Sequence, residues 1–425
     1  MSTLSRVTSN TAWQIGSKIG NSVSGLIIIA LITRHFGDQG VGIYTLVLGY
    51  LGFFFMPVDF GLNAIAVKHL LDQKRSAQKV FGNLLGLRLT IGALVMLLAL
   101  IIIWVLPYDP ASNTGYSNLV KIGVTVQILT ILAQALLATT NAFFQARHNY
   151  KYSFYANLCS AVFNTGLVCL LILNGFPLIY TLAAFSISGI VGATTALLLV
   201  KKQLKQISVL TDKNYWKEML TETLPLTISL ILNLVYFRID SLILPFYRQL
   251  EEVGHYNVAY KIFDTLLVLP NYFANSIYPV LLERYAQSID AFTKIIKKSV
   301  LTLTILALAG TAATYILAPL AVQILLSHPN PETIQYLRIL SSGLIFFFLS
   351  SIATWSLIII NKQKYLSYIY GGTMIINITL NILLIPLYGA LASAYITIAT
   401  EALVLILTGT LVFINLTTGK AHNDH

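Results

Sequence analysis

The sequence predicts an all-α polytopic membrane protein with twelve transmembrane helices in two six-helix lobes related by a parallel repeat. Three observations support this. Of the 425 residues, 56% are hydrophobic and only 10% are charged, whereas a soluble domain carries about 25% charged residues. The apolar residues gather in long runs along the whole chain. Short sequence matches also recur at a spacing near half its length.

Each expected helix is an apolar run long enough to cross the hydrocarbon core, which takes about 20 residues. The runs lie at 11–33, 41–65, 80–106, 118–141, 152–174, 178–200, 223–246, 256–282, 299–326, 334–360, 365–386 and 389–415. An even number of helices places both termini on the same side of the membrane.

The distribution of Lys and Arg predicts which side that is. In the connections between the expected helices these residues lie on the side of the N-terminus, except for Arg34 and Arg248. Cytoplasmic loops are enriched in Lys and Arg, so we expect cytoplasmic termini. Most of the net charge of +11 then reflects topology, and no nucleic-acid partner is expected.

A basic, polar connection at about 201–222 divides the chain into an expected N-terminal lobe, 1–205, and a C-terminal lobe, 206–425. At an offset of 212 residues, VGIY at 41–44 aligns with VGHY at 253–256. With six helices in each half, both lobes share one orientation, which makes the repeat parallel. Such lobes usually face each other across a central cavity.

Polar residues inside the expected helices form stripes at helical spacing. They are Gln14, Lys18, Asn21 and Gly25 in the first helix, Ser229, Asn233, Tyr236 and Asp240 in the seventh, and Asn257, Lys261, Asp264, Asn271 and Asn275 in the eighth. An ionisable residue at a helix centre costs about 2.5–3.5 kcal/mol on insertion scales. The stripes therefore either line a hydrated cavity or form hydrogen bonds between helices.

The charged residues in the expected helices differ in which other residues could pair with them. Arg238 and Asp240 are two residues apart, so they project to nearly opposite sides of their helix and cannot pair along it. Lys261 and Asp264 are three apart and can pair on one face. Arg88 has no acidic neighbour at helical spacing. Its anionic partner must come from another helix or from a ligand.

Three further residues have simpler interpretations. Lys121 and Arg338 lie close to helix ends, where their side chains can snorkel to the interface. Glu401 is isolated in the twelfth helix. It is either a proton or ion site or a buried, hydrogen-bonded carboxyl group.

Motifs for catalysis are missing from the sequence. It has no GxxxxGK[ST], no HExxH, no GxSxG and no Cys/His metal spacing. We therefore predict no catalytic residues, no metal site and no cofactor. A charged path without a reaction centre favours a secondary transporter over an enzyme.

Several stretches resemble one known family. They read TRHFGDQGVGIY at 33–44, VDFGLN at 58–63, YFRID at 236–240, VGHYNVAYK at 253–261 and NITLNILLIPLYGA at 377–390. The chain resembles the Wzx-type polysaccharide flippases of the multidrug/oligosaccharidyl-lipid/polysaccharide exporter (MOP) superfamily. The last stretch is similar to that family's junction between the eleventh and twelfth helices.

The resemblance implies a flippase in the inner membrane of a bacterial or archaeal cell, working by alternating access through a cationic central cavity. Its cargo would be an oligosaccharide on an isoprenyl pyrophosphate, and its partners membrane lipids and polysaccharide-assembly proteins. A pyrophosphate needs cations and the sugar needs polar groups. The substrate-binding candidates are Lys18, Arg88, Arg238, Lys261, Gln14, Asn21, Asn233 and Asn257. The ion-coupling candidates are Asp59, Asp240, Asp264 and Glu401.

Two other functions compete with this one. A cation-coupled multidrug antiporter of the same superfamily would favour acidic cavity residues, and the candidate charges here are of both signs. A membrane-embedded glycosyltransferase or polysaccharide polymerase would carry a large catalytic loop opposite the termini. The longest expected connection on that side is only 107–117.

Overall fold

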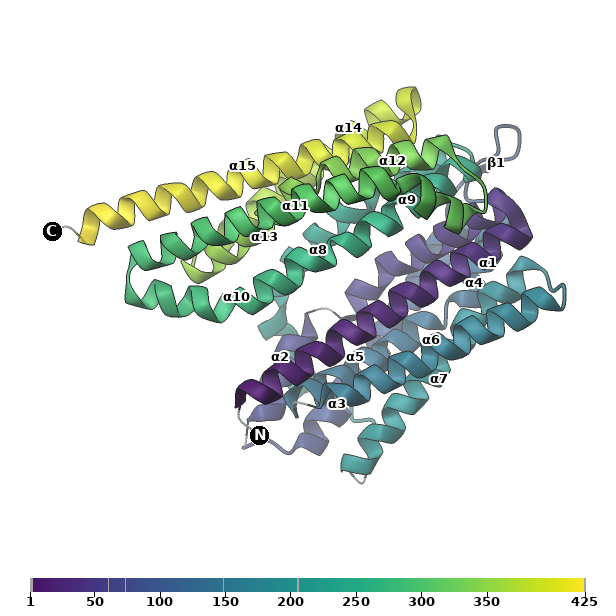
Figure 1. Ribbon diagram of the computed structural model, residues 1–425. Helices are drawn as coiled ribbons and strands as arrows, with labels where there is room; N and C mark the ends of the chain where they lie inside the picture. Colours follow the sequence, from purple (N-terminus) through teal and green to yellow (C-terminus); the bar gives the residue numbers. More distant parts are fainter. Residues whose placement is uncertain (1–2, 60, 73, 148, 205, 424–425) are drawn as a thin grey trace. The chain divides into compact units, whose positions relative to one another are not determined.

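The computed structural model describes residues 3–59, 61–72, 74–147, 149–204 and 206–423 (Figure 1). The first half of the chain consists of α1 (Thr3–Asp59), α2 (Leu62–Leu71), α3 (Ala77–Val105), α4 (Asn118–Gln127), α5 (Thr130–Ala146), α6 (Tyr150–Leu173) and α7 (Leu178–Leu204). A two-stranded antiparallel hairpin, β1 (Tyr108–Asp109) and β2 (Thr114–Gly115), joins α3 to α4.

The second half begins with α8 (Lys213–Ile243) and a 3₁₀ turn at Leu244–Phe246. It continues with α9 (Leu250–Leu266), α10 (Val268–Gln287), α11 (Ile289–Leu326), α12 (Pro331–Ser342), α13 (Leu344–Ile359), α14 (Lys364–Tyr388) and α15 (Ala390–Asn423).

The first two expected helices form the single long element α1, with a break at Gly37. The backbone there has φ 68° and ψ −170°, outside the helical region, in a conformation that glycine adopts at little steric cost. The second helix was expected to continue to residue 65 but ends at Asp59. Gly61 then takes a left-handed conformation with φ 63°, and α2 begins at Leu62.

Nine segments of the described residues are long and apolar enough to cross a membrane. A tenth is formed by α9 and α10 together, as Leu250–Tyr278 and Val280–Gln287, with a bend of 43° between these two parts. One of the nine, Gly16–Asp59, has 44 residues and contains the break at Gly37. That is about 66 Å of helix, twice the thickness of the hydrocarbon core, so it supplies two spans. α8 has 31 residues but is not among these segments; counted with them at the expected 223–246, it brings the total to the predicted twelve spans.

Some expected helices are interrupted within their span. The helix expected at 118–141 is divided into α4 and α5, and the one expected at 334–360 is divided into α12 and α13 at Gly343. These breaks involve one or two residues, and the apolar runs pass through them without interruption. Hydropathy therefore predicts the span but not the break.

The chain forms two compact units, Met1–Ile231 and Leu232–His425, here called the N-terminal and C-terminal units. The division falls inside α8. The predicted lobe boundary at 205/206 stays a prediction about where the duplicated halves divide, and residue 205 lies outside the described residues. In the N-terminal unit, α6 packs against both α1 and α7. In the C-terminal unit, α15 packs against both α13 and α14.

The first turns of α8 are packed into the N-terminal unit. Met219 is buried with Leu62 and Ala66 of α2 and Leu84 of α3 in one apolar cluster. The connection before α8 is held as well, because the amide of Leu210 donates a 3.0 Å hydrogen bond to the carbonyl of Gly82. The basic connection that was expected to separate the lobes therefore lies against α3.

Candidate functional site

Arg88 of α3 is completely buried and pairs with Asp59 at the end of α1. Its Nη2 donates to Oδ1 of Asp59 at 2.5 Å, and 37% of the Asp59 side chain is exposed. Nε and Nη1 of Arg88 have no hydrogen-bond partner among the described residues. The structure thus pairs the predicted substrate-binding residue Arg88 with the predicted ion-coupling residue Asp59. Two nitrogens of the guanidinium group are left without a hydrogen-bond acceptor among the described residues.

The polar stripe of α1 lies away from its contact with α6. Lys18 and Asn21 are exposed, and Gln14 is half-buried. Their neighbour Ser17 accepts a 3.0 Å hydrogen bond from Asn157 of α6, and Ser24 contacts Thr165 of α6 at 2.7 Å. It is therefore the intervening serines that link α1 to α6.

In the C-terminal unit, Arg238 of α8 lies between a carboxylate and an aromatic ring. It donates through Nη2 to Oδ2 of Asp264 in α9, and its guanidinium carbon is 5.2 Å from the ring centroid of Tyr260. Even so, 39% of its side chain is exposed. Arg238 is therefore a charge with a fixed orientation and an accessible surface.

Asp240 is buried in a network of hydroxyl and amide donors. Its carboxylate accepts hydrogen bonds from the hydroxyl of Tyr256 in α9, from Thr397 of α15 at 3.5 Å and from the backbone amide of Ser241 at 2.8 Å. As expected, Asp240 does not pair with Arg238. The two side chains contact different residues, Tyr256 and Asp264 respectively.

Glu401 of α15 has a similar environment. It accepts hydrogen bonds from Tyr236 of α8 at 2.9 Å and from Ser350 of α13. Only 3% of the residue is exposed. Both carboxyl groups are thus bonded to neutral hydroxyls, in surroundings where burial disfavours a bare negative charge.

The other candidates of the C-terminal unit are exposed or half-buried. Lys261 is exposed and Asn233 is half-buried. Asn257 is half-buried too, and its side-chain Nδ2 is a buried donor without a hydrogen-bond partner among the described residues. Asp264 accepts a hydrogen bond from Arg238, and its pairing with Lys261 stays a prediction.

Some contributing residues were not among the site candidates drawn from the sequence, although Tyr236 lies in the polar stripe of the seventh expected helix. Tyr236 and Tyr256 supply the hydroxyls that hold Glu401 and Asp240. Tyr256 and Tyr260 do lie four residues apart on α9, a spacing that places them on one face. In α14, Asn377 donates to the hydroxyl of Thr400 at 3.1 Å and Asn381 accepts from the hydroxyl of Ser393 at 3.0 Å, both in α15, so part of the family-like stretch serves helix packing.

A further charged group lies outside the membrane-length segments. His69 of α2 is 2% exposed, and burial lowers its pKa. Glu222 of α8 receives a hydrogen bond from Lys68 and Glu218 receives one from Arg75, which lower the pKa of each carboxyl group. At neutral pH the histidine is therefore neutral and both carboxyls are ionised. No sequence motif indicated this group, because His69 is far from the glutamates along the chain.

The arrangement of the described residues positions charges that can bind ions. Each unit holds an arginine–aspartate pair on its helices, and the C-terminal unit adds two hydroxyl-bonded carboxyls. An anion can displace an aspartate from an arginine, and a carboxyl bonded to hydroxyls can take up a proton or a small cation. Both are binding events, as in transport.

Solved structures with a similar fold include transporters of the MOP superfamily. A multidrug resistance MATE family transporter in an inward-facing conformation superposes with a TM-score of 0.78 at 11% identity, covering 94% of this chain and 96% of that one. The lipid II flippase MurJ, inward closed, gives 0.74 at 16% identity, covering 94% and 87%. A MOP superfamily transporter from Pyrococcus furiosus Vc1, described as having a binding pocket of reverse polarity, gives 0.57 at 13%, covering 97% and 94%.

The fold class is therefore that of MOP-superfamily membrane transporters. Residues 7–285 match the family described as polysaccharide biosynthesis protein. The chain belongs to that family, which confirms the resemblance found in the sequence. Comparison with curated protein sequences gave no significant match.

Proposed function

We propose that this protein is a flippase that moves an isoprenyl-pyrophosphate-linked oligosaccharide across the inner membrane during polysaccharide biosynthesis. Membership of the polysaccharide biosynthesis family and the MOP transporter fold support the general class. Alternating access, cytoplasmic termini and the predicted lobes 1–205 and 206–425 are parts of this proposal.

The observation that carries the proposal is Arg238. A guanidinium within a membrane-length helix is costly to place against lipid, yet this side chain is 39% exposed. Its plane is set by Asp264 and Tyr260. An arginine held in this way can bind phosphate oxygens with two parallel hydrogen bonds.

The cargo would exchange with the aspartate. Binding of a pyrophosphate to Arg238 would release Asp264, and return of Asp264 would help release the cargo. Lys261, one turn before Asp264 on α9, would supply a second cation. Asn233 and Asn257 would offer amide groups to the sugar.

The N-terminal unit would contribute a second group of cations. Lys18 is exposed on α1, and Arg88 keeps two unbonded nitrogens beside the partly exposed Asp59. Gln14 and Asn21 would add polar contacts. Asp59, Asp240, Asp264 and Glu401 are the proposed sites for coupling to an ion, since each carboxyl can change its charge or partner.

The competing function is a cation-coupled multidrug antiporter, and the MATE structures have the same fold. A competition assay separates the two. Wild-type protein in liposomes is given a fluorescent isoprenyl-pyrophosphate oligosaccharide, and translocation is followed by loss of the label to a membrane-impermeant quencher. We expect translocation that an unlabelled anionic lipid inhibits. Transport of a cationic dye, with no movement of the anionic lipid, would favour the antiporter.

A further inference from the structure

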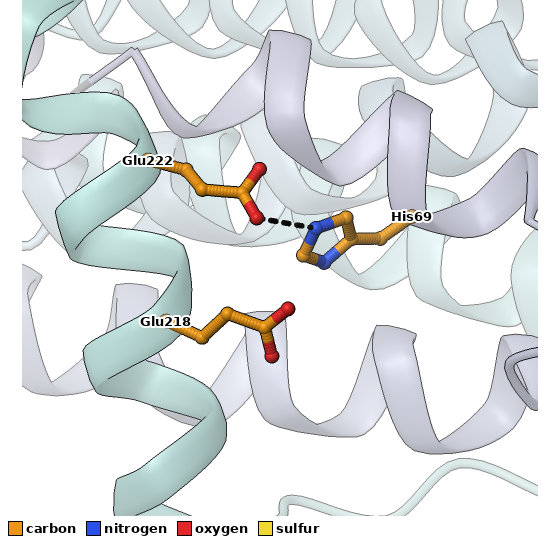
Figure 2. Close-up of side chains that lie close together, drawn as sticks. All are labelled: His69, Glu218 and Glu222. Carbon is orange, nitrogen blue, oxygen red and sulfur yellow. Dashed lines mark ion pairs between the residues drawn. The ribbon is translucent and has the colours of Figure 1, made fainter.

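We propose that His69, Glu218 and Glu222 form a binding site for a divalent transition-metal ion, of which Zn²⁺ is the best fit, joining α2 to the beginning of α8. The imidazole nitrogen and the carboxylate oxygens that could act as ligands all lie within 4.8 Å of one another. Figure 2 shows His69 reaching from α2 toward two glutamates that lie one turn apart on α8.

The histidine is the strongest indication of a ligand. Nε2 of His69 is buried and has no hydrogen-bond partner among the described residues. Its ion-pair contact with Oε1 of Glu222 is 3.6 Å long (Figure 2), which is too far for a hydrogen bond. A buried nitrogen that faces a carboxylate at this separation leaves a position that a cation would occupy favourably.

The surrounding side chains resemble the outer shell of a metal site. The hydroxyl of Tyr215 lies 2.7 Å from Nδ1 of His69, and Nη1 of Arg75 lies 3.4 Å from the same nitrogen; the shorter contact, with Nδ1 as the donor, is the one that metal binding at Nε2 requires. Lys68 donates to Oε2 of Glu222 at 2.9 Å, and Arg75 donates to Oε1 of Glu218 at 2.7 Å. Such bonds orient metal ligands, and a hydrogen bond donated from Nδ1 leaves the Nε2 lone pair free for a metal.

The local charge also favours a cation. Arg75 contacts Asp72 at 3.3 Å in addition to Glu218. The group therefore contains the carboxylates of Asp72, Glu218 and Glu222 and the cations Lys68 and Arg75. These side chains leave one negative charge beside the imidazole before any metal binds.

The helices that carry the ligands are fixed by packing. Leu62 and Ala66 of α2 and Met219 of α8 are buried in the same apolar cluster. Zinc holds nitrogen and oxygen ligands at about 2.0–2.2 Å, so side-chain rotations of about an ångström would complete the site. Three protein ligands would leave a fourth position for water.

Metal binding at this place would tie down a helix that both units share. The ligands lie in the first turns of α8, and the same helix continues past Ile231 into the C-terminal unit. A bound ion would therefore stabilise the attachment of α8 to α2. This inference does not depend on which cargo is moved.

The test is Zn²⁺ binding to the full chain, purified in detergent without a histidine tag and stripped with a chelator. Titration calorimetry and elemental analysis should show one Zn²⁺ per chain and a higher unfolding temperature with Zn²⁺. His69→Ala, Glu218→Gln and Glu222→Gln should each weaken binding at least about tenfold. Glu283→Gln, an exposed glutamate of α10 bonded to Gln287, is the matched control and should bind as wild type.

The C-terminal histidines need their own control, because His422 and His425 lie beyond the side chains that the structure describes. The variant His422→Ala with His425→Ala should keep the site. X-ray absorption of the zinc-loaded wild type, which does not depend on variants folding, should show one imidazole with oxygen ligands. No stoichiometric binding, site variants that bind as tightly as wild type, or more than one imidazole in the shell would overturn the proposal.

Discussion

Nη2 of Arg88 donates a 2.5 Å hydrogen bond to Oδ1 of Asp59, joining a fully buried guanidinium of α3 to a carboxylate that is 37% exposed at the end of α1. The two residues are 29 positions apart in sequence. The pair neutralises a charge that would otherwise be very costly inside the membrane. It therefore has a structural role whether or not the cargo contacts it.

Removing one partner of this pair should be worse than removing both. We expect Asp59→Ala to lower the free energy of unfolding by about 2 kcal/mol or more, because Arg88 stays buried without its counter-charge. Adding Arg88→Met should restore part of that loss, since no buried charge remains. Thermal unfolding in detergent measures the stability of the single and double variants. A double variant that loses as much stability as the two single variants together would contradict the pairing argument.

The segment before α8 should pack closely against α3 only if residue 86 has no side chain, as in Gly86. A Cβ atom at this position would lie 2.1 Å from the carbonyl oxygen of Leu210 and 3.1 Å from the Trp216 ring. Gly86→Ala should therefore destabilise the protein, by about 1–3 kcal/mol for overpacking. The control is Gly49→Ala, where a Cβ meets nothing within 4 Å; there, better helix propensity should leave stability equal or slightly higher. Equal unfolding temperatures for the two variants would refute the close approach.

The hydroxyl of Tyr236 should matter because it bonds a buried carboxyl group. Tyr236→Phe leaves Glu401 with Ser350 as its remaining side-chain donor among the described residues, at a cost of about 1–3 kcal/mol. Tyr315→Phe is the control, since that residue is 55% exposed and its ring contact with Arg338 survives the change. The two variants are compared by their thermal unfolding midpoints. A Tyr236→Phe protein as stable as the control would count against the hydrogen bonds around Glu401.

Much of the fold could be predicted because the bilayer imposes a simple rule. Runs of about 20 apolar residues gave the twelve spans. The breaks at Gly37 and Gly343 could not be predicted, since hydropathy continues through them. The same limit explains the missed β1–β2 hairpin, which is two residues wide on each strand.

The candidate site was only partly predictable. Helical spacing excluded an Arg238–Asp240 pair and required a distant partner for Arg88, but it could not identify Asp59 or Asp264. Those contacts depend on how helices pack against each other, which spacing along one helix does not contain. His69 and Glu222 illustrate the same point, because tertiary packing alone brings α2 to the beginning of α8.

The most direct test of the account is the initial rate at which liposomes containing Arg238→Ala translocate a fluorescent isoprenyl-pyrophosphate oligosaccharide. Loss of a charge-assisted contact worth about 1.5–3 kcal/mol predicts a rate reduced about tenfold or more. Arg238→Lys should be intermediate, and Arg284→Ala, an exposed arginine bonded to Gln287, should match wild type. An Arg238→Ala rate equal to that of wild type would contradict the central claim.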